Sequence, residues 1–425
     1  MGGRGRRLLA ASACAAVVAA GCSSSSHSSS SAPASSAASS SAAAGSPTTA
    51  GAPATTGGAA ASGTPIKIGL IAEGISPGTP YSNLAISAAG ANAAVKAINA
   101  AGGVNGHPLD LVTCDTQNDP NDAATCGRTM VSDGIAALVG SITGFGANVL
   151  PILTAAHIAS LGQIAVGAAD LTNPDGFPFA PAGIDVAVGE PDLAARLGAT
   201  KISEVRVDLS ATAQLPQLAA IGLSSHGLKL INSVALPMNA PDMSSYVAAA
   251  TANGTDGISL ILQPNDLVNF VKAAKAAGFK GKLVSDAANV LRNLTGGFAS
   301  TMEGVYVVDE AKPATDTSDP AVQKFNTELA AVDTKVTPDY TVEDAWASVY
   351  LFAQVAKPLP TVDAASILAA MPTVTDFDSG VFPPIDFSKP VKFPGLHIFN
   401  PDVFYEQVQG GKLVPVTGQF VDLLG

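Results

Sequence analysis

The stretch GLIAEGISPGTPYSN (69–83) places a sharp glycine-rich turn directly after an apolar run. Around Ser76 it matches the G-x-S-x-G pattern of serine hydrolases, in which the nucleophile stands on a strained turn between a strand and a helix. That chemistry also uses the backbone N–H of the next residue to stabilise the oxyanion. The next residue is Pro77, which has no N–H, so we do not expect catalysis. We expect instead that the other backbone amides of residues 74–78, with Tyr81 beyond them, hold a bound molecule.

The cysteines predict a disulfide rather than a metal site. Cys14 belongs to the expected signal peptide and Cys22 is the expected lipidation site, both described below, which leaves Cys114 and Cys126 as the remaining pair. In an exported protein such a pair most often forms a disulfide, which would stabilise the fold by roughly 3 kcal/mol on the chain-entropy model. The alternative is a zinc site, but this pair, with only His107 nearby, lacks the usual ligand spacing. We therefore expect no metal and no other cofactor.

The charge of the chain argues against nucleic acid as a partner. The formal net charge is −12, and it becomes −15 when the three arginines of the first 21 residues are removed. An acidic surface repels phosphate backbones, and no cluster of lysine and arginine interrupts it. Since no predicted strand is followed by the glycine pattern of a phosphate-binding loop, nucleotide binding is not expected either.

The N-terminal segment predicts export and tethering. Three arginines followed by an apolar stretch are typical of a signal peptide, which we place at 1–21. The sequence VAAGC, ending at Cys22, resembles the lipobox of bacterial lipoproteins, in which the cysteine is lipidated; the alternative is an ordinary cleaved signal. Residues 22–64 are almost only Ser, Ala, Thr, Gly and Pro and cannot bury enough apolar surface to fold. We expect a flexible tether to the outer face of the bacterial cell membrane.

The body from Pro65 onward predicts two successive α/β lobes. Strands alternate with helices of ten or more residues, which indicates parallel pairing through right-handed crossovers. The pattern restarts after the Pro/Gly-rich passage 173–183. Such sheets bind ligands at the carboxyl ends of their strands, so we expect a cleft between the lobes. The expected strands are 66–73, 108–114 and 135–140 in the first lobe, and 204–210, 228–236, 256–263, 281–286 and 302–311 in the second.

Three local features complete the expected elements. Asn118, Asp119 and Pro120 open a helix that ends near Gly134, and Asn265 caps a later helix. A long helix is expected over 342–356. The glycine pair between alternating runs over 404–416 predicts a hairpin.

Several segments in order resemble one known family. These are GGVNGHPLDLVTCDTQNDPNDAATC (102–126), LVGSITGFGANVLPIL (138–153), APDMSSYVAAATANGTDGISLILQ (240–263) and FVKAAKAAGFKGKLVSD (270–286). They are similar to the periplasmic-binding-protein type I family, specifically to the Leu/Ile/Val-binding branch of ABC transporter solute receptors. The resemblance implies an α/β fold of two Rossmann-like lobes with a central ligand cleft and three hinge crossings. The implied boundaries are 65–184 plus 310–379 for lobe 1, and 185–309 plus 380–425 for lobe 2.

The resemblance also implies a function without catalysis. It predicts a monomeric lipoprotein that closes on a small molecule, such as a branched-chain or related amino acid, and delivers it to an ABC permease in the membrane. A ligand-sensing component of a signalling system is the alternative, and a secreted serine hydrolase using Ser76 is less favoured. The family often has an aromatic residue in the first loop of the second lobe, whereas residues 208–212 contain none. The expected ligands therefore include other small polar or aliphatic compounds.

The family pattern points to specific binding residues. Its members commonly hold an amino-acid carboxylate with amides and hydroxyls before a helix of the first lobe, and helix N-termini favour anions. A bound ammonium requires a facing anion, for which the counterpart in the second lobe is Asp286. The expected ligand-binding residues are Tyr81 from the turn, Ser141, Thr143, Gly144 and Phe145 before the helix, Gly162 and Gln163 after the fourth strand, and Asp208, Gln263 and Asp286 in the second lobe.

Overall fold

The computed structural model describes residues 61–75, 82–180, 183, 185–209, 212–392 and 396–424. The expected signal peptide, the lipidation site Cys22, most of the tether, Ser76 and Tyr81 therefore lie outside the described residues. Within the described ranges, no helix is both long enough and apolar enough to span a bilayer.

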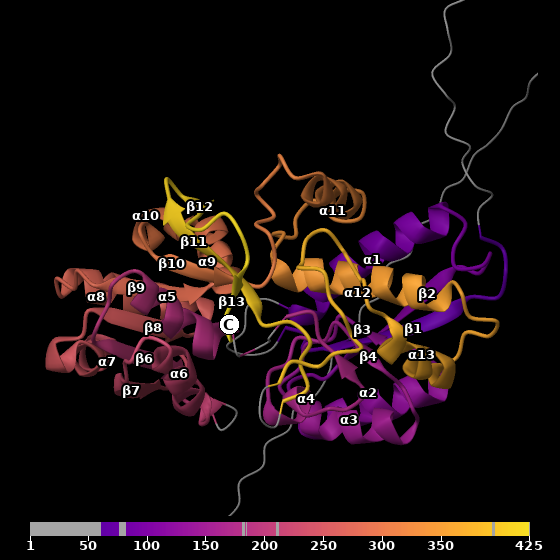
Figure 1. The fold of residues 1–425 in the computed structure, drawn as a ribbon, viewed down its shortest axis with the longest axis horizontal. Helices are drawn as coiled ribbons and strands as arrows, with labels where there is room; N and C mark the ends of the chain where they lie inside the picture. The colour runs from indigo at the N-terminus through magenta and orange to yellow at the C-terminus, as the bar shows by residue number, and fades with distance from the viewer. Residues whose placement is uncertain are drawn as a thin grey trace, which may run out of the picture. The chain divides into compact units, whose positions relative to one another are not determined.

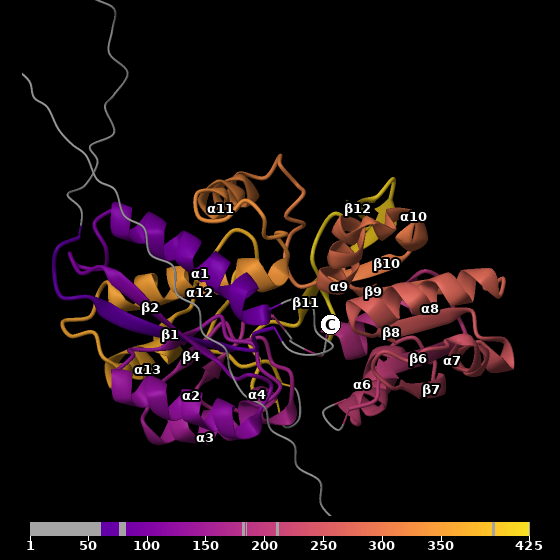
Figure 2. The same ribbon diagram turned by 180° about the vertical axis from the view of Figure 1, so that it is seen from behind.

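The first sheet has five parallel strands in the order β2-β1-β3-β4-β5. Figures 1 and 2 show α1 and α12 on one face of this sheet and α2 and α3 on the other. The predicted alternation of strands and helices is confirmed here. The strands are β1 (Ile66–Ala72), β2 (Leu109–Asp115), β3 (Leu138–Val139), β4 (Ser160–Leu161) and β5 (Gly176–Phe177). The helices are α1 (Asn83–Ala100), α2 (Pro120–Asp133), α3 (Gly146–Ala155), α4 (Ala168–Leu171), α11 (Pro320–Ala330), α12 (Tyr340–Ala356) and α13 (Ala364–Ala370).

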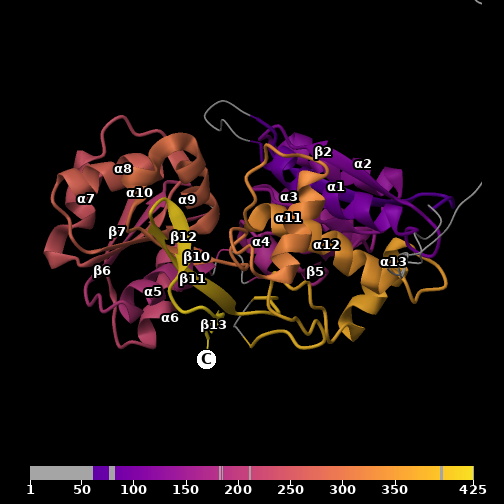
Figure 3. The same ribbon diagram turned by 90° about the horizontal axis from the view of Figure 1, so that it is seen from above.

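The second sheet has eight strands, and its main path follows the order β12-β11-β10-β9-β8-β6-β7. Strands β6 to β10 are parallel, whereas β11 and β12 join as antiparallel strands. Figure 3 shows α7 and α8 on one face and α5 and α6 on the other. The strands are β6 (Ile202–Val207), β7 (Leu230–Leu236), β8 (Gly257–Ile261), β9 (Lys282–Asp286), β10 (Tyr306–Asp309), β11 (Asp402–Gln409), β12 (Lys412–Pro415) and β13 (Val421–Asp422). The helices are α5 (Glu190–Arg196), α6 (Leu215–Ser224), α7 (Ser244–Ala250), α8 (Pro264–Ala276), α9 (Ala287–Asn293) and α10 (Ala299–Met302).

Local sequence signals explain most of the helix ends. Asp119 caps α2 by accepting the N–H groups of the first turn, and Gly134 ends it at φ 68°, as predicted. The predicted cap Asn265 is wrong, because α8 begins at Pro264 with Gln263 as its N-cap. Proline is favoured at the first helical position, where its missing N–H costs no hydrogen bond. The helix therefore begins earlier in the sequence than predicted.

The predicted hairpin is confirmed near the C-terminus. Gln409 pairs with Lys412 across the two-residue turn that joins β11 to β12. Gly410 and Gly411 have φ values of 59° and 76°, the left-handed values that the turn requires at both positions.

The chain passes between the two sheets three times, which confirms the expected crossings. It leaves the first sheet after β5, returns after β10, and crosses again before β11. Phe387 and Phe399 belong to the core of the first sheet, and Phe399 stacks on Phe177 with ring centroids 5.7 Å apart. We therefore propose a last crossing near Asn400, later than the expected boundary after residue 379.

We call the first sheet with its helices the first unit and the second sheet with its helices the second unit. A disulfide joins β2 to α2 in the first unit. Cys114 and Cys126 are bonded, with their Cα atoms 5.6 Å apart, as the cysteine count predicts. The bond closes a short loop that begins at the carboxyl edge of the first sheet. The bond therefore limits the conformations that this loop can adopt in the unfolded chain, which stabilises the folded protein.

Replacing both cysteines with serine should lower the free energy of unfolding by roughly 3 kcal/mol, because the unfolded chain regains the entropy of the open loop. Urea unfolding followed by circular dichroism measures this change. Reduction of the unmodified protein should produce the same loss, which serves as a control. Two thiols that react with Ellman's reagent in the unreduced native protein would contradict the assignment.

Candidate functional site

The loops that follow β1, β3 and β4 meet at the carboxyl edge of the first sheet. Ile142 forms parallel bridges with both Ala72 and Ile164, so these three segments run side by side beyond the strands. Because carboxyl edges are where α/β sheets bind ligands, this is the first place to look for a site. The arrangement brings Ser141, Thr143 and Gln163 together around one small cavity.

The predicted carboxylate-binding loop already holds a carboxylate, that of Glu73. The Thr143 hydroxyl donates to Glu73 Oε1 over 2.7 Å, and the Gly144 N–H donates to the same oxygen over 2.9 Å. The Phe145 N–H donates to Thr143 Oγ1 over 3.1 Å, and Phe145 is the N-cap of α3. Sequence reasoning correctly identified donors suited to an anion but missed Glu73, which follows β1 directly.

Ser141 and Gln163 point into the interior. Ser141 Oγ accepts the Ile71 N–H over 2.9 Å, and Gln163 Nε2 donates to the Asp170 carbonyl over 3.3 Å. Both side chains, with Thr143, line a cavity of about 10 Å³, roughly the space of one water molecule. Gln163 Oε1 faces this region buried and without a hydrogen-bond partner among the described residues. These side chains therefore support the loop through hydrogen bonds in the interior of the protein.

Gly162 serves the packing of β4 against α12. Its φ is 56°, and a Cβ atom there would lie 2.0 Å from Ser348 Oγ and 2.7 Å from the Phe179 ring. Its N–H donates to the Phe177 carbonyl over 2.8 Å, so this amide is already used within the sheet edge.

Further carboxyl groups surround the same edge. Asp115 Oδ1 accepts the Gly74 N–H over 2.8 Å, which engages one of the amides expected to face a ligand. Asp170 Oδ2 accepts the Gly167 N–H over 3.0 Å. Burial, with a smaller contribution from the charge of Glu73, raises the pKa of Asp170 to about 6. Among the described residues, no lysine, arginine or histidine forms an ion pair with the carboxyl groups of Glu73, Asp115 or Asp170.

The predicted residues of the second sheet are not equally placed. Asp286 is 4% exposed and caps α9, accepting the Asn289 N–H over 2.9 Å and the Asn289 side-chain amide over 2.8 Å. Burial raises the pKa of Asp286. Gln263 is half-buried as the N-cap of α8. Asp208 is exposed at the end of β6.

Buried carboxyl groups also gather where the chain crosses between the sheets. The charge of Asp185, on the first crossing, acts on Glu310, on the second, and the charge of Asp286 acts on Asp185. Burial raises the pKa of Asp185 to about 6, that of Asp309 to about 7 and that of Glu310 well above its usual value. Arg292 pairs with Asp339 over 3.2 Å beside them. Within the described part of the chain, no three acidic, histidine or cysteine side chains are placed to hold a metal ion.

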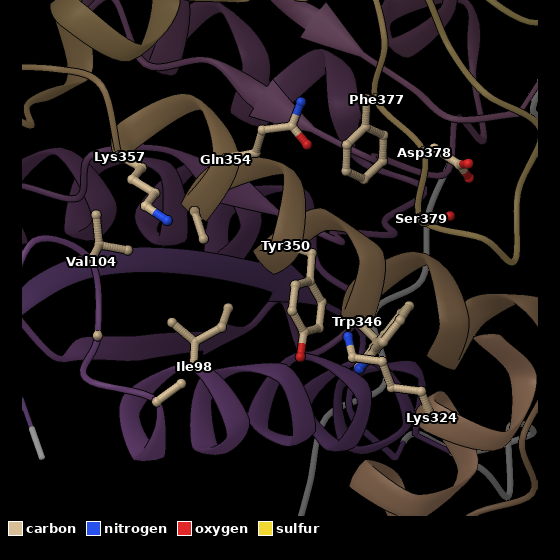
Figure 4. A pocket seen from close by; sticks show the side chains of 13 residues that line it. Ile98, Val104, Lys324, Trp346, Tyr350, Gln354, Lys357, Phe377, Asp378 and Ser379 are labelled. Atoms are coloured by element: carbon tan, nitrogen blue, oxygen red, sulfur yellow. The ribbon is translucent and has the colours of Figure 1, made fainter. Parts of the chain in front are cut away.

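A larger cavity of about 490 Å³ lies on the first unit, beside α1 and α12 (Figure 4). Lys324 Nζ lies 3.6 Å from the centre of the Tyr350 ring and 4.7 Å from that of Trp346. Trp346 is 2% exposed and donates to Glu328. The lysine, the two rings and the carboxylate therefore already interact with one another. The lining from α1 comes from its C-terminal end, which lies at the amino edge of the sheet. None of the predicted binding residues lines this cavity, and we place the candidate site at the carboxyl edge instead.

The chain is similar to known proteins in sequence and in fold. The family described as "Periplasmic binding protein" matches residues 65–402. A curated relative, the Leu/Ile/Val-binding protein homolog 7 of Brucella abortus (strain 2308), is 27% identical over 265 residues, which cover 56% of this chain and 64% of that protein. This chain thus matches slightly less than two thirds of the relative's length.

Solved structures share the fold. The crystal structure of a possible leucine/isoleucine/valine-binding protein from Rhodopirellula baltica SH 1 aligns with a TM-score of 0.72 and 13% identity, covering 85% of this chain and 98% of that one. A solute binding protein of an ABC transporter from R. palustris, in complex with 4-hydroxybenzoate, aligns with a TM-score of 0.68 and 18% identity, covering 84% and 97%. At these identities the likeness shows the fold alone, that of two α/β units.

The buried carboxyl groups predict that stability falls as the pH rises. Their pKa values are about 4 in an unfolded chain, but about 6 for Asp170 and about 7 for Asp309 in the folded protein. The folded state therefore binds more protons between these limits, and stability present at low pH is lost as the pH rises through this window. We expect the melting temperature at pH 8 to be lower than at pH 5 by roughly 5 °C or more.

Differential scanning calorimetry across this pH range measures the effect. Asp309→Asn should flatten the dependence, because the amide stays neutral while keeping an oxygen to accept the Ala311 N–H. Asp110→Asn, at an exposed position of β2, should leave the slope unchanged. A melting temperature that rises from pH 5 to pH 8 would refute the explanation.

Proposed function

Because the chain belongs to the periplasmic binding protein family, we propose that it is the solute-binding component of an ABC importer. In this proposal the protein binds a small molecule between its two α/β units, closes by a hinge motion at the crossings, and presents the molecule to a membrane permease. The curated relative's name points to branched-chain amino acids, and we take small amino acids, their amides and related amines or alcohols as the ligand class. The protein would act without catalysis.

One observation carries this proposal. The Thr143 hydroxyl and the Gly144 N–H converge on a single oxygen at the carboxyl edge of the first sheet, which makes that edge a built polar site. Asp286, buried at the carboxyl end of β9, supplies the corresponding acidic group on the second sheet. Two sheets that each present polar groups at their carboxyl ends suit a ligand held between them.

The proposed location follows from the N-terminal sequence. We infer an extracytoplasmic protein that is lipidated on Cys22 and held by the tether over residues 22–64 at the outer face of the cell membrane. Metabolic labelling with a fatty-acid analogue tests this part separately, since Cys22→Ser should abolish the label and release the protein from membranes.

The ligand-binding proposal is tested with a thermal-shift screen over amino acids, amino-acid amides, amines, alcohols and small carboxylates. Asp286→Asn should weaken any ligand that carries an ammonium group by about tenfold or more, the scale of a charge-assisted hydrogen bond. Asparagine caps helices as well as aspartate, so the melting temperature of the empty variant should not fall. Isothermal titration calorimetry measures the affinity.

Asp110→Asn is the matched control for this experiment, because it removes an equal charge at an exposed site of the first unit. Its ligand affinity should equal that of the unmodified protein. Unchanged affinity in Asp286→Asn, for a ligand with an ammonium group, would remove Asp286 from the site. A screen without any stabilising compound would count against the proposed ligand class.

A further inference from the structure

The position of Glu73 bears on which chemical groups a ligand can present to the first unit. Glu73 follows the last residue of β1, and its carbonyl accepts the Leu84 N–H over 2.9 Å, which fixes the main chain beside the start of α1. Its side chain reaches the loop before α3, where Thr143 and Gly144 donate to Oε1. This loop lies at the positive end of the α3 dipole, which stabilises a carboxylate.

The donors that suit a ligand carboxylate are therefore occupied from within. Thr143 is 7% exposed, and its hydroxyl hydrogen is directed to Glu73, while its oxygen accepts the Phe145 N–H. A second carboxylate on the same donors would lie within hydrogen-bonding distance of Glu73, and two like charges so close cannot both stay ionised without a large cost. Asp170 adds to this cost because its carboxylate lies close to the start of α3. A Cβ atom added to Gly146, the first residue of α3, would lie only 2.4 Å from that carboxylate.

The remaining oxygen of Glu73 can serve a ligand of the opposite kind. Among the residues that the structure describes, both donors to Glu73 use Oε1, and Oε2 accepts no hydrogen bond. A carboxylate oxygen accepts hydrogen bonds only, so its natural partners are ammonium, amide and hydroxyl groups. A further acceptor at this edge, the buried Gln163 Oε1, also lacks a partner among the described residues.

We propose that Glu73 is a built-in carboxylate that fills the anion-binding loop formed by Thr143 and Gly144, so that this subsite rejects a ligand carboxylate and accepts an amine or hydroxyl group. The inference rests on the proposed function, which it narrows. A solute of this protein is held at the first unit by the hydrogen atoms that it donates. Its negatively charged group, where it has one, lies elsewhere.

The occupancy of the loop is tested with acetate, which requires no knowledge of the natural ligand. The probe is the Gly144 amide signal in ¹H–¹⁵N TROSY spectra of the full chain, titrated with sodium acetate at constant ionic strength. We expect no saturable shift in the unmodified protein and a saturable shift in Glu73→Ala, with affinity at least tenfold higher. Thr143→Val in the Glu73→Ala background should abolish this gain, because the hydroxyl donor is lost.

Two results would overturn the inference. One is an acetate affinity at Gly144 that is the same in the unmodified protein and in Glu73→Ala. The other is a well-folded Glu73→Ala variant that gains no acetate binding. Glu73→Gln is the second variant, for the case that the alanine variant is unstable: it removes the charge and should still raise acetate affinity several-fold. Asp110→Asn, which removes an exposed charge of β2, should gain nothing.

The ligand class is tested with a matched pair, leucinol and L-leucine, by isothermal titration calorimetry. The unmodified protein should favour leucinol, and Glu73→Ala should shift the preference toward L-leucine by at least tenfold. L-leucine favoured equally in both proteins would overturn the inference. Failure of the proposed function is distinct: neither these compounds nor any in the screen would bind, while acetate would still bind at Gly144 only after Glu73 is removed.

Discussion

A carboxylate that leaves water must find hydrogen-bond donors, a cation or a proton, and this constraint governs both α/β units. Glu73 finds donors in the loop before α3. Asp192 in the second unit finds a cation in Arg196, which lies 2.5 Å away; its other oxygen lies 2.7 Å from His226 Nε2, and it also accepts the Tyr405 hydroxyl. The carboxyl groups at the crossings have fewer cations near them, and burial raises their pKa values, so they keep their protons to a higher pH than an exposed carboxyl group does.

Much of the fold could be predicted because its signals are local. Apolar runs separated by helical periods define parallel strands, and Asp119 before Pro120 marks a helix start through the N–H groups that its side chain accepts. Gly410 and Gly411 identify the hairpin because the turn requires positive φ at both positions. The cysteine pair was predictable by counting, since the expected signal peptide contains Cys14 and the expected lipidation uses Cys22. Apart from the cysteine count, each of these inferences uses residues close to one another in the sequence.

The details of the site depend on contacts between distant segments, and most of them could not be read from the sequence. Thr143 and Gly144 were identified from the pattern before α3, but the group on their donors comes from Glu73, seventy positions earlier. A signal did exist, because β1 and β3 are neighbours in the sheet, and an acid at the end of one strand meets the loop after the next. The aromatic packing of Phe387 and Phe399 on β5 has no such signal, since the segment before β11 contains neither a regular period nor a helix.

The internal carboxylate changes what selects a ligand at the first unit. A helix N-terminus alone would favour any small anion, and shape alone would have to separate one acid from another. With Glu73 in place, binding depends first on whether the ligand's polar group donates hydrogen bonds or carries a negative charge. The reason is that the acids at this edge have no cation paired to them among the described residues. In the proposed site, Asp286 gives the second unit the same preference. On this proposal, selection by hydrogen-bond donors on both sides follows from the carboxylates that the chain itself carries to the two edges.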